Sequence, residues 1–291
     1  MSCPDCFNGA VHEGTPTGTV TKLHNIDIYV AEPSSGNPPQ AIIGESAADL
    51  DWGGTVLIPD IFGWTFVNLQ LMADSFAKKK DYRVYVPDFM KGNAAPVSML
   101  ESLRKVLVPK TWYDTFSKPY HILWLLATAF PAIYFNRPGK TFPTVKSFME
   151  SLRQNEAAHL PVGVTGYCWG GKHTILLAEG FTVDSKPLMD AGFTAHPSFL
   201  DLFGDIEKMT VPVSFAIGDK DNQVSPTQGK QLEKIILDKP DGQKGEYRVY
   251  AGYGHGFACR GDVLNDDPKG AVEAEEQALA WFEKHFEGVK Y

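Results

Sequence analysis

Hydrophobic and polar residues follow two different periods along this chain. Short apolar stretches rich in β-branched residues predict strands, and longer segments with apolar positions every three or four residues predict helices. Strands are expected within residues 22–32, 55–60, 82–88, 160–168, 186–198, 211–221 and 245–257. Helices are expected within residues 68–80, 96–107, 144–155, 171–180, 225–239 and 268–288, with Ser225 as an N-cap. This alternation is typical of an α/β fold with a mostly parallel central sheet and helices on both faces, and it predicts a single domain over residues 1–291.

An aromatic-rich segment at residues 110–140 interrupts the alternation. Its eight aromatic side chains are Trp112, Tyr113, Phe116, Tyr120, Trp124, Phe130, Tyr134 and Phe135. Three interpretations are open: a cap-like insertion over a binding site, a part of the hydrophobic core, or a helix that contacts a membrane. The segment lacks the Lys/Arg-rich face that membrane-contacting helices usually have. We therefore favour a cap over core packing, and core packing over membrane contact.

The composition narrows the class of protein. Of the 291 residues, 43% are hydrophobic and 21% are charged, as in soluble globular proteins with a sizeable core. The formal net charge of −8 and the lack of a basic stripe argue against a nucleic-acid partner. No secretion signal is visible, and the longest apolar segment, residues 122–135, is too short to span a bilayer. We expect a cytoplasmic protein without a membrane partner.

Two of the four cysteines lie close to the N-terminus. Cys3 and Cys6 form a C-x-x-C pair, but no second Cys/His pair at zinc-finger spacing follows them. We therefore expect no metal site there. Residues 1–24 are expected to form an N-terminal extension that lies over the domain.

Cys168 lies in the sequence GYCWGG, between a predicted strand and a predicted helix. The Gly-x-Cys-x-Gly spacing has small residues, Gly166 and Gly170, where a sharp strand-to-helix turn needs them. Such a turn lifts the central side chain above the sheet, and a helix N-terminus lowers the pKa of a thiol beside it. The motif also fits a small buried cysteine in a glycine-rich turn. Whether the sequence supplies a histidine base and an acid for Cys168 therefore distinguishes the two interpretations.

A cysteine nucleophile needs a histidine base and an acid that orients the histidine. Asp219 and Asp221 compete for the acid in IGDKDNQVSP, and His255 in GYGHGF competes with His196 in TAHPS for the base. Asp221 fits a G-x-x-D-x-x-V-x-P loop. Asp221 and His255 also follow Cys168 in the order nucleophile, acid, histidine that is found in α/β-hydrolases. We therefore predict that Cys168, Asp221 and His255 act together.

Two backbone amides would complete this site. The N–H of Trp169 follows the cysteine directly, and the N–H of Ile61 lies in the loop after the strand that contains LIPD. Both are expected to point toward the oxyanion that forms when a carbonyl is attacked. The predicted residues all follow strands, and ligands of open α/β sheets bind at that carboxyl edge.

Taken together and in this order, LIPDIFGW, GYCWGG, DKDNQVSP and GHGFACR resemble the dienelactone hydrolase family from about residue 25 to the end. The N-terminal SCPDCFNGAVHEGTPTG is similar to an extension of fungal-type members. The resemblance implies an α/β-hydrolase fold and a catalytic triad of Cys168, His255 and Asp221. It also implies that Asp60 matches a glutamate that interacts with the resting thiol in the family, although aspartate is one methylene shorter.

The resemblance further implies a hydrolase of a small ester or lactone that needs no cofactor; the cyclic enol lactones of the family's bacterial members are not carried over to this chain. The substrate-binding positions that it implies are Phe62, Trp64, Lys91, Phe257 and Arg260. Lys91 lies near the position of a family arginine that holds a substrate carboxylate, and lysine cannot form the bidentate fork of arginine. We therefore expect a small-molecule ester or lactone as substrate, without naming it, and a monomer or homodimer. The alternatives are an isomerase, cyclase or lyase that uses the same pocket, and a non-catalytic small-molecule-binding protein.

Overall fold

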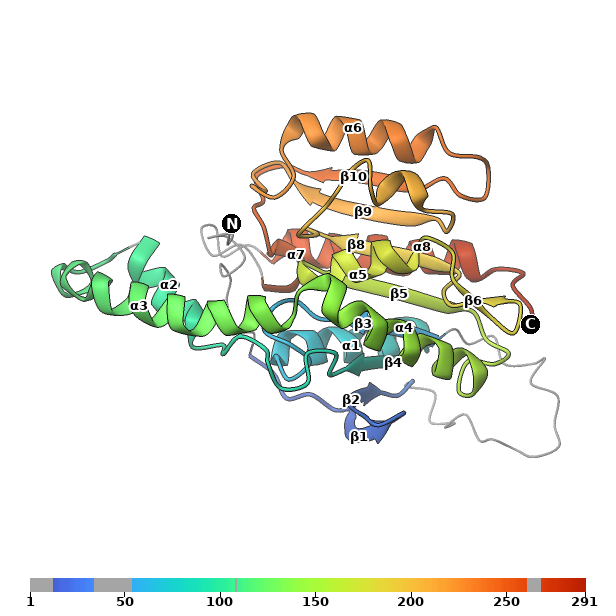
Figure 1. Cartoon of the computed structure of the whole chain (residues 1–291), viewed down its shortest axis with the longest axis horizontal. Helices are drawn as coiled ribbons and strands as arrows, with labels where there is room; N and C mark the ends of the chain where they lie inside the picture. The colour runs from blue at the N-terminus through green and yellow to red at the C-terminus, as the bar shows by residue number, and fades with distance from the viewer. Residues whose placement is uncertain (1–12, 34–53, 108, 261–267) are drawn as a thin grey trace.

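The computed structural model describes residues 13–33, 54–107, 109–260 and 268–291. Its centre is an eight-stranded sheet in the order β1-β2-β4-β3-β5-β8-β9-β10 (Figure 1). The six strands from β4 to β10 are parallel, and the β1–β2 hairpin joins β4 in antiparallel orientation. The strands are Thr19–Leu23 (β1), Ile26–Ala31 (β2), Gly54–Ile58 (β3), Arg83–Pro87 (β4), Val162–Tyr167 (β5), Ala191–Ala195 (β8), Val213–Gly218 (β9) and Glu246–Tyr250 (β10). The predicted mostly parallel sheet is confirmed. Two short strands, Thr182–Val183 (β6) and Lys186–Pro187 (β7), pair separately.

Alternate side chains of the central strands face opposite sides of the sheet, because successive residues of a strand point in opposite directions. In β3, Leu57 packs into one hydrophobic cluster, whereas Val56 and Ile58 pack into the other. The first cluster includes side chains from helices Val67–Lys80 (α1), Phe257–Arg260 (α7) and Lys269–Phe286 (α8). The second includes side chains from helices Pro138–Gln154 (α4), Trp169–Leu177 (α5) and Pro226–Leu237 (α6). Helices therefore cover both faces, as the sequence predicts.

The predicted N-cap of α6 is present. The Ser225 side chain accepts a hydrogen bond from the Gln228 N–H (3.3 Å), and the Gln228 side chain accepts one from the Ser225 N–H (3.0 Å). This capping box satisfies two amides that the first turn of a helix leaves without partners. It also starts α6 at a defined point just after the loop that carries Asp221.

The aromatic-rich segment forms most of a helical hairpin that projects beyond the sheet (Figure 1). Helix Met99–Leu107 (α2) leads into the 24-residue helix Trp112–Phe135 (α3). All eight aromatic side chains of the segment are exposed, and α3 buries only His121 and Ala132. The core-packing interpretation is therefore wrong, because α3 leaves the body of the molecule and packs along one side only. The interpretation as a cap stays a prediction.

Membrane crossing is not supported by any helix in these four ranges, since none is both long and apolar enough. Cys3 and Cys6, with the first half of the predicted N-terminal extension, lie outside the described residues. Close to the described end of that extension, the Thr17 N–H donates to Asp74 of α1 at 2.7 Å.

Candidate active site

Cys168 occupies the predicted turn between β5 and α5. Its backbone has φ 53° and ψ −109°, a conformation that costs a residue other than glycine roughly 1–3 kcal/mol. The chain is crowded on both sides of it. A Cβ on Gly166 would lie 2.3 Å from the Gly170 carbonyl oxygen, and a Cβ on Gly170 would lie 2.1 Å from that of Ile58. Both glycines are required by close backbone approach, so the turn holds Cys168 in this conformation.

The turn is also bonded to the neighbouring strand. The Cys168 N–H donates to the carbonyl oxygen of Ala195, the last residue of β8, at 3.3 Å. The Ser198 N–H donates back to the Cys168 carbonyl oxygen at 2.9 Å. These two bonds bring the loop after β8 beside the cysteine, although that loop lies about 30 residues further along the chain.

The structure brings His255 and Asp221 together at the same edge. His255 lies between β10 and α7, and Asp221 lies in the loop between β9 and α6. His255 Nδ1 is 3.1 Å from each carboxylate oxygen of Asp221, and both side chains are fully buried. Asp221 Oδ1 also accepts from the Gln223 N–H at 2.8 Å, which fixes the carboxylate from its other side.

Burial and charge act on His255 in opposite directions. Burial, the largest single influence, disfavours the charged ring, but the negative charges of Asp221 and Cys168 and the ring's hydrogen bonds with these two side chains together hold the pKa of His255 well above its usual value. The imidazolium form is therefore favoured when a thiolate is beside it. A ring of this kind can stabilise a negative charge on the neighbouring sulfur.

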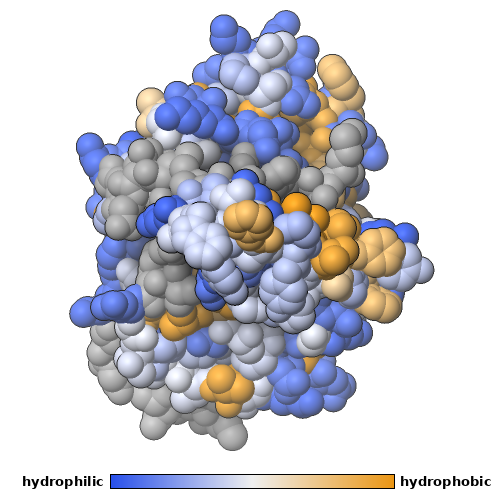
Figure 2. Space-filling model, turned by 90° about the vertical axis from the view of Figure 1, so that its left-hand side faces the viewer, coloured by the Kyte–Doolittle hydropathy of each residue, from blue (hydrophilic) through white to orange (hydrophobic). Residues whose placement is uncertain are grey.

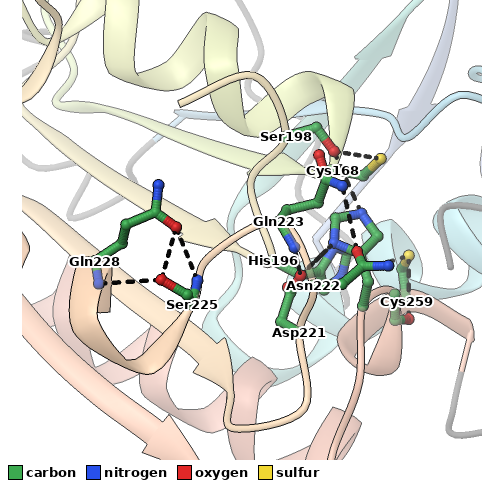
Figure 3. Close-up of polar contacts among 11 residues, drawn as sticks. Cys168, His196, Ser198, Asp221, Asn222, Gln223, Ser225, Gln228 and Cys259 are labelled. Carbon is green, nitrogen blue, oxygen red and sulfur yellow. Dashed lines mark hydrogen bonds and ion pairs between the residues drawn. The ribbon is translucent and has the colours of Figure 1, made fainter. Parts of the chain in front are cut away.

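Ser198 lies between the cysteine and the histidine, and sequence reasoning did not find it. Its Oγ is 3.3 Å from Cys168 Sγ, and Figure 3 shows the two side chains facing each other. The same Oγ is 3.3 Å from His255 Nε2. A hydroxyl can donate to one neighbour and accept from the other. The four side chains thus form a continuous buried chain from Cys168 through Ser198 and His255 to Asp221.

Asp219 and His196, the alternative candidates for the acid and the base, are not part of this chain of four side chains. Asp219 is exposed, and its Oδ1 accepts from the Gly252 N–H at 2.7 Å. His196 is buried with its ring centroid 5.0 Å from that of His255, in an edge-on contact. Burial, with the positive charges of His255 and Arg260, holds the pKa of His196 well below its usual value, so this ring is neutral.

Asp60 follows β3 and belongs to a second buried group. Its Oδ1 accepts from the Phe62 N–H at 3.0 Å, and its Oδ2 lies 3.4 Å from Arg260 Nε and 3.6 Å from Cys259 Sγ. Burial raises the pKa of Asp60 to about 6; the positive charge of Arg260 opposes this rise, and the negative charge of Cys168 adds to it. The Cys168 thiolate therefore affects Asp60 electrostatically.

Cys259 differs from Cys168 in its surroundings. Burial and the negative charge of Asp60 raise the pKa of the Cys259 thiol well above its usual value, so it stays protonated and donates to the carboxylate. The Asn68 side chain donates to the Cys259 carbonyl oxygen at 3.0 Å. Only Cys168 of the two described cysteines lies at a strand-to-helix turn beside an acid–base pair.

The two predicted oxyanion amides belong to the loop after β3 and to the first turn of α5, and these two segments touch. The Gly170 N–H donates to the Pro59 carbonyl oxygen at 3.1 Å, which holds the start of α5 against the loop after β3. Among the described residues, the N–H groups of Ile61 and Trp169 are not bonded to a loop or turn carbonyl.

The predicted substrate-binding residues fall into two sets. Phe62, Phe257 and Arg260 are buried, and the Arg260 guanidinium lies 5.5 Å from the centre of the Phe62 ring. Trp64 is half-buried, and Lys91 is exposed in a turn with φ 50°. Phe62 and Arg260 contact Asp60, and the centre of the Phe257 ring lies 5.7 Å from that of the His196 ring. Lys91 shows no bond to the triad in the part of the chain that the structure describes.

Comparisons with known proteins identify the family and the fold of this chain. The model of the dienelactone hydrolase family matches residues 40–286. The chain is 27% identical to "Hydrolase tropI" of Talaromyces stipitatus, over 98% of this chain and 96% of that protein. It is also 27% identical to "Dienlactone hydrolase 1" of Gibberella moniliformis, over 88% and 82%. A solved structure of a putative dienelactone hydrolase from Klebsiella pneumoniae superposes with a TM-score of 0.62 at 16% identity, over 92% and 98% of the chains, and so has the same fold.

Proposed function

The chain belongs to the dienelactone hydrolase family and is an ester or lactone hydrolase, and we propose that Cys168 is its nucleophile, His255 its general base and Asp221 the acid that orients the base. The observation that carries the proposal is the buried His255–Asp221 pair beside a cysteine on a strained strand-to-helix turn. The family match supports the reaction class, and the contacts within this chain support the roles of the three residues.

The reaction has two halves. In the first, Cys168 gives its proton to His255, and the sulfur attacks the carbonyl carbon of the substrate. The amides of Ile61 and Trp169 donate to the oxyanion of the tetrahedral intermediate. The intermediate collapses to a thioester, and the leaving alkoxide takes the proton from His255. With a lactone, this alkoxide stays on the same molecule as the acyl group.

In the second half, water replaces the leaving group. His255 accepts a proton from the water as its oxygen attacks the thioester carbon. The second tetrahedral intermediate then expels the Cys168 thiolate, which recovers its proton from His255. The products are a carboxylic acid and an alcohol, or a hydroxy acid from a lactone, and the enzyme returns to its starting state.

Ser198 takes part as a proton relay between the sulfur and the ring. Its hydroxyl can accept the thiol proton while it donates its own proton to His255 Nε2, which gives the proton a second path beside the direct hydrogen bond between Cys168 and His255. The distances of 3.3 Å on each side of the Ser198 oxygen support this role. Ser198 also holds the two reacting groups at a fixed separation.

Asp60 modulates the nucleophile through its charge. When ionised, it disfavours a second negative charge on Cys168, and its contact with Arg260 limits this effect. When protonated, it removes the repulsion. Asp60 therefore adjusts the pH range over which the thiolate forms, without contributing a step of its own.

The experiment is a screen of aryl esters and small lactones with wild-type protein and Cys168→Ala side by side, combined with intact-mass detection of the acyl-enzyme. We expect hydrolysis and one added acyl group in the wild type, mapped by peptide mass spectrometry to Cys168, and neither in Cys168→Ala. Full activity in Cys168→Ala, or an acyl group mapped to Cys259, would refute the assignment of the nucleophile.

A further inference from the structure

Helix α3 is apolar on two opposite sides. Toward α2 and the body, it packs through His121, Leu125, Ala129 and Ala132, and His121 Nδ1 lies 3.1 Å from Ser102 Oγ of α2. Leu123 is two residues, or about 200° of helix rotation, from Leu125 and so faces outward. A helix that is apolar all round normally lies in a core, yet the outward side of α3 has no cover among the described residues.

The outward side carries a continuous stripe of large side chains, which we call the outer seam: Trp112, Phe116, Tyr120, Leu123, Leu126, Phe130 and Tyr134. These residues recur every three or four positions and share one side of the helix. Trp112, Phe116 and Phe130 are 76%, 78% and 70% exposed. Viewed from the side on which the hairpin projects, orange and pale surface lies near the centre, among blue side chains (Figure 2).

The outer seam is symmetric about Leu123. Trp112 and Tyr134 are equally far from it along the helix, as are Phe116 and Phe130. Tyr120 and Leu126 form a third pair. Two copies of α3 packed antiparallel would therefore set aromatic rings against aromatic rings toward both ends and leucine against leucine at the centre. This is the self-complementarity that a twofold interface requires.

The exposed area is large enough for a stable contact. An aromatic side chain buries about 150–250 Å², so the exposed fractions of the five aromatic residues of the outer seam amount to roughly 500–800 Å². The two leucines add to this area. A standard interface buries about 800 Å² on each partner, so one outer seam supplies about what each half of a dimer needs.

The distribution of charged residues indicates which kind of partner the outer seam would bind. No charged residue occurs from residue 119 to residue 135, so a polar partner surface would bury its own groups without compensation. The net charge of −8 opposes approach to an anionic lipid surface. A second copy of the chain presents an equally apolar stripe of matching length.

We propose that the outer seam is a self-association surface and that its occupant is the outer seam of a second copy, packed antiparallel with the twofold axis at Leu123. The contact brings Trp112 of one copy to Tyr134 of the other. Tyr134 lies two residues before Asn136, whose carbonyl oxygen accepts from the Trp169 indole N–H at 2.5 Å. The ends of the interface thus lie near the residue that follows Cys168.

The first test is the mass of the purified full-length protein by sedimentation equilibrium across a concentration series. The wild type is expected to be a dimer. Leu123→Glu sets two carboxylates against each other on the axis and should raise the dissociation constant at least ~100-fold. The matched control is Leu237→Glu, at an exposed leucine of α6 with 50% exposure, which should leave the dimer intact. Circular dichroism and ester hydrolysis verify that both variants are folded.

The second test determines which residues of the two α3 helices face each other, by disulfide crosslinking. It does not require a variant that disrupts the contact. Leu123→Cys should form a disulfide between two copies at the introduced thiol on mild oxidation, because equivalent positions meet only at the axis. Phe116→Cys alone should not crosslink, whereas a mixture of Phe116→Cys and Phe130→Cys should. Peptide mass spectrometry identifies the linked positions.

Three results would overturn the proposal. One is a wild-type protein that stays monomeric at every concentration, and another is a dimer that Leu123→Glu leaves unchanged. The third is a monomer that cosediments with phosphatidylcholine or phosphatidylserine vesicles and loses this binding in Leu123→Glu, which would assign the outer seam to a membrane surface.

Discussion

Replacing Asp221 by asparagine isolates the charge that supports His255. Asparagine has nearly the same shape and keeps an oxygen that can accept from the ring, so the side chain should stay in place. The substitution removes the negative charge of the Asp221 carboxylate. Both oxygens of that carboxylate lie 3.1 Å from His255 Nδ1, and the two side chains are fully buried. Two unit charges about 4 Å apart interact by about 4 kcal/mol at an effective dielectric constant of 20. That energy corresponds to a loss of about 10³-fold in kcat/KM.

The assay combines hydrolysis of an activated aryl ester with the rate at which iodoacetamide alkylates Cys168, both measured across pH. Asp221 raises the pKa of His255, so the imidazolium that accompanies the thiolate persists to higher pH in the wild type. Without that charge the ring gives up its proton more readily and stabilises the thiolate less. The pH of half-maximal alkylation should therefore rise in Asp221→Asn, together with the loss of hydrolysis.

Asp219→Asn is the matched control, because Asp219 is an exposed acid two residues away and bonds only to the Gly252 N–H in the contacts described above. It should leave both measurements unchanged. The reasoning fails if Asp221→Asn keeps kcat/KM within about tenfold of the wild type, or if its alkylation profile does not move.

Three further changes test neighbouring parts of the site. Ser198→Ala should lower kcat about tenfold without raising KM, as expected for the loss of one relay hydrogen bond; an unchanged kcat would remove Ser198 from the proton path. Asp60→Asn should move the alkylation profile of Cys168 to lower pH, opposite to Asp221→Asn, and should abolish any bend near pH 6, where Asp60 titrates; a shift to higher pH would contradict the proposed repulsion. Gly170→Ala puts a Cβ 2.1 Å from a β3 carbonyl oxygen and should lower both the melting temperature and the activity, whereas Gly139→Ala, with open space around it, should slightly stabilise α4; equal effects of the two would show that the turn tolerates a side chain.

The acid–base pair could be predicted because its signals are local. Asp221 lies three residues after the end of β9 and His255 five residues after the end of β10, and parallel strands end at the same edge of a sheet. The choice of Asp221 over Asp219 depended on the spacing within a single loop. The structure shows the same separation, with Asp221 turned to the histidine and Asp219 turned to solvent.

Ser198 could not be found in this way, because its position depends on which strands are neighbours. In HPS, the histidine attracts attention and the serine has no distinguishing local feature. The backbone of His196 has φ 40°, and the chain after it turns so that Ser198 meets the nucleophile turn across the β5–β8 pairing. The pattern of hydrophobic and polar residues does not predict such a turn.

Whether α3 is buried or exposed could not be predicted from the sequence either. An aromatic-rich segment with apolar residues on every side has the same pattern whether it lies in a core or projects from it. The difference is set by α2, which covers one side of α3 and leaves the other exposed. Tertiary packing decided the outcome here, and local propensity did not distinguish the alternatives.

The burial of Cys168 has a consequence for the timing of each catalytic cycle. Its side chain is 2% exposed, and its neighbours Ser198 and His255 are as deeply enclosed. We therefore expect side chains around the sulfur to move before a substrate carbonyl comes within bonding distance of it. Such motions limit the rate of many enzymes whose chemistry is fast. Low exposure should also slow the reaction of the thiol with electrophiles in bulk water.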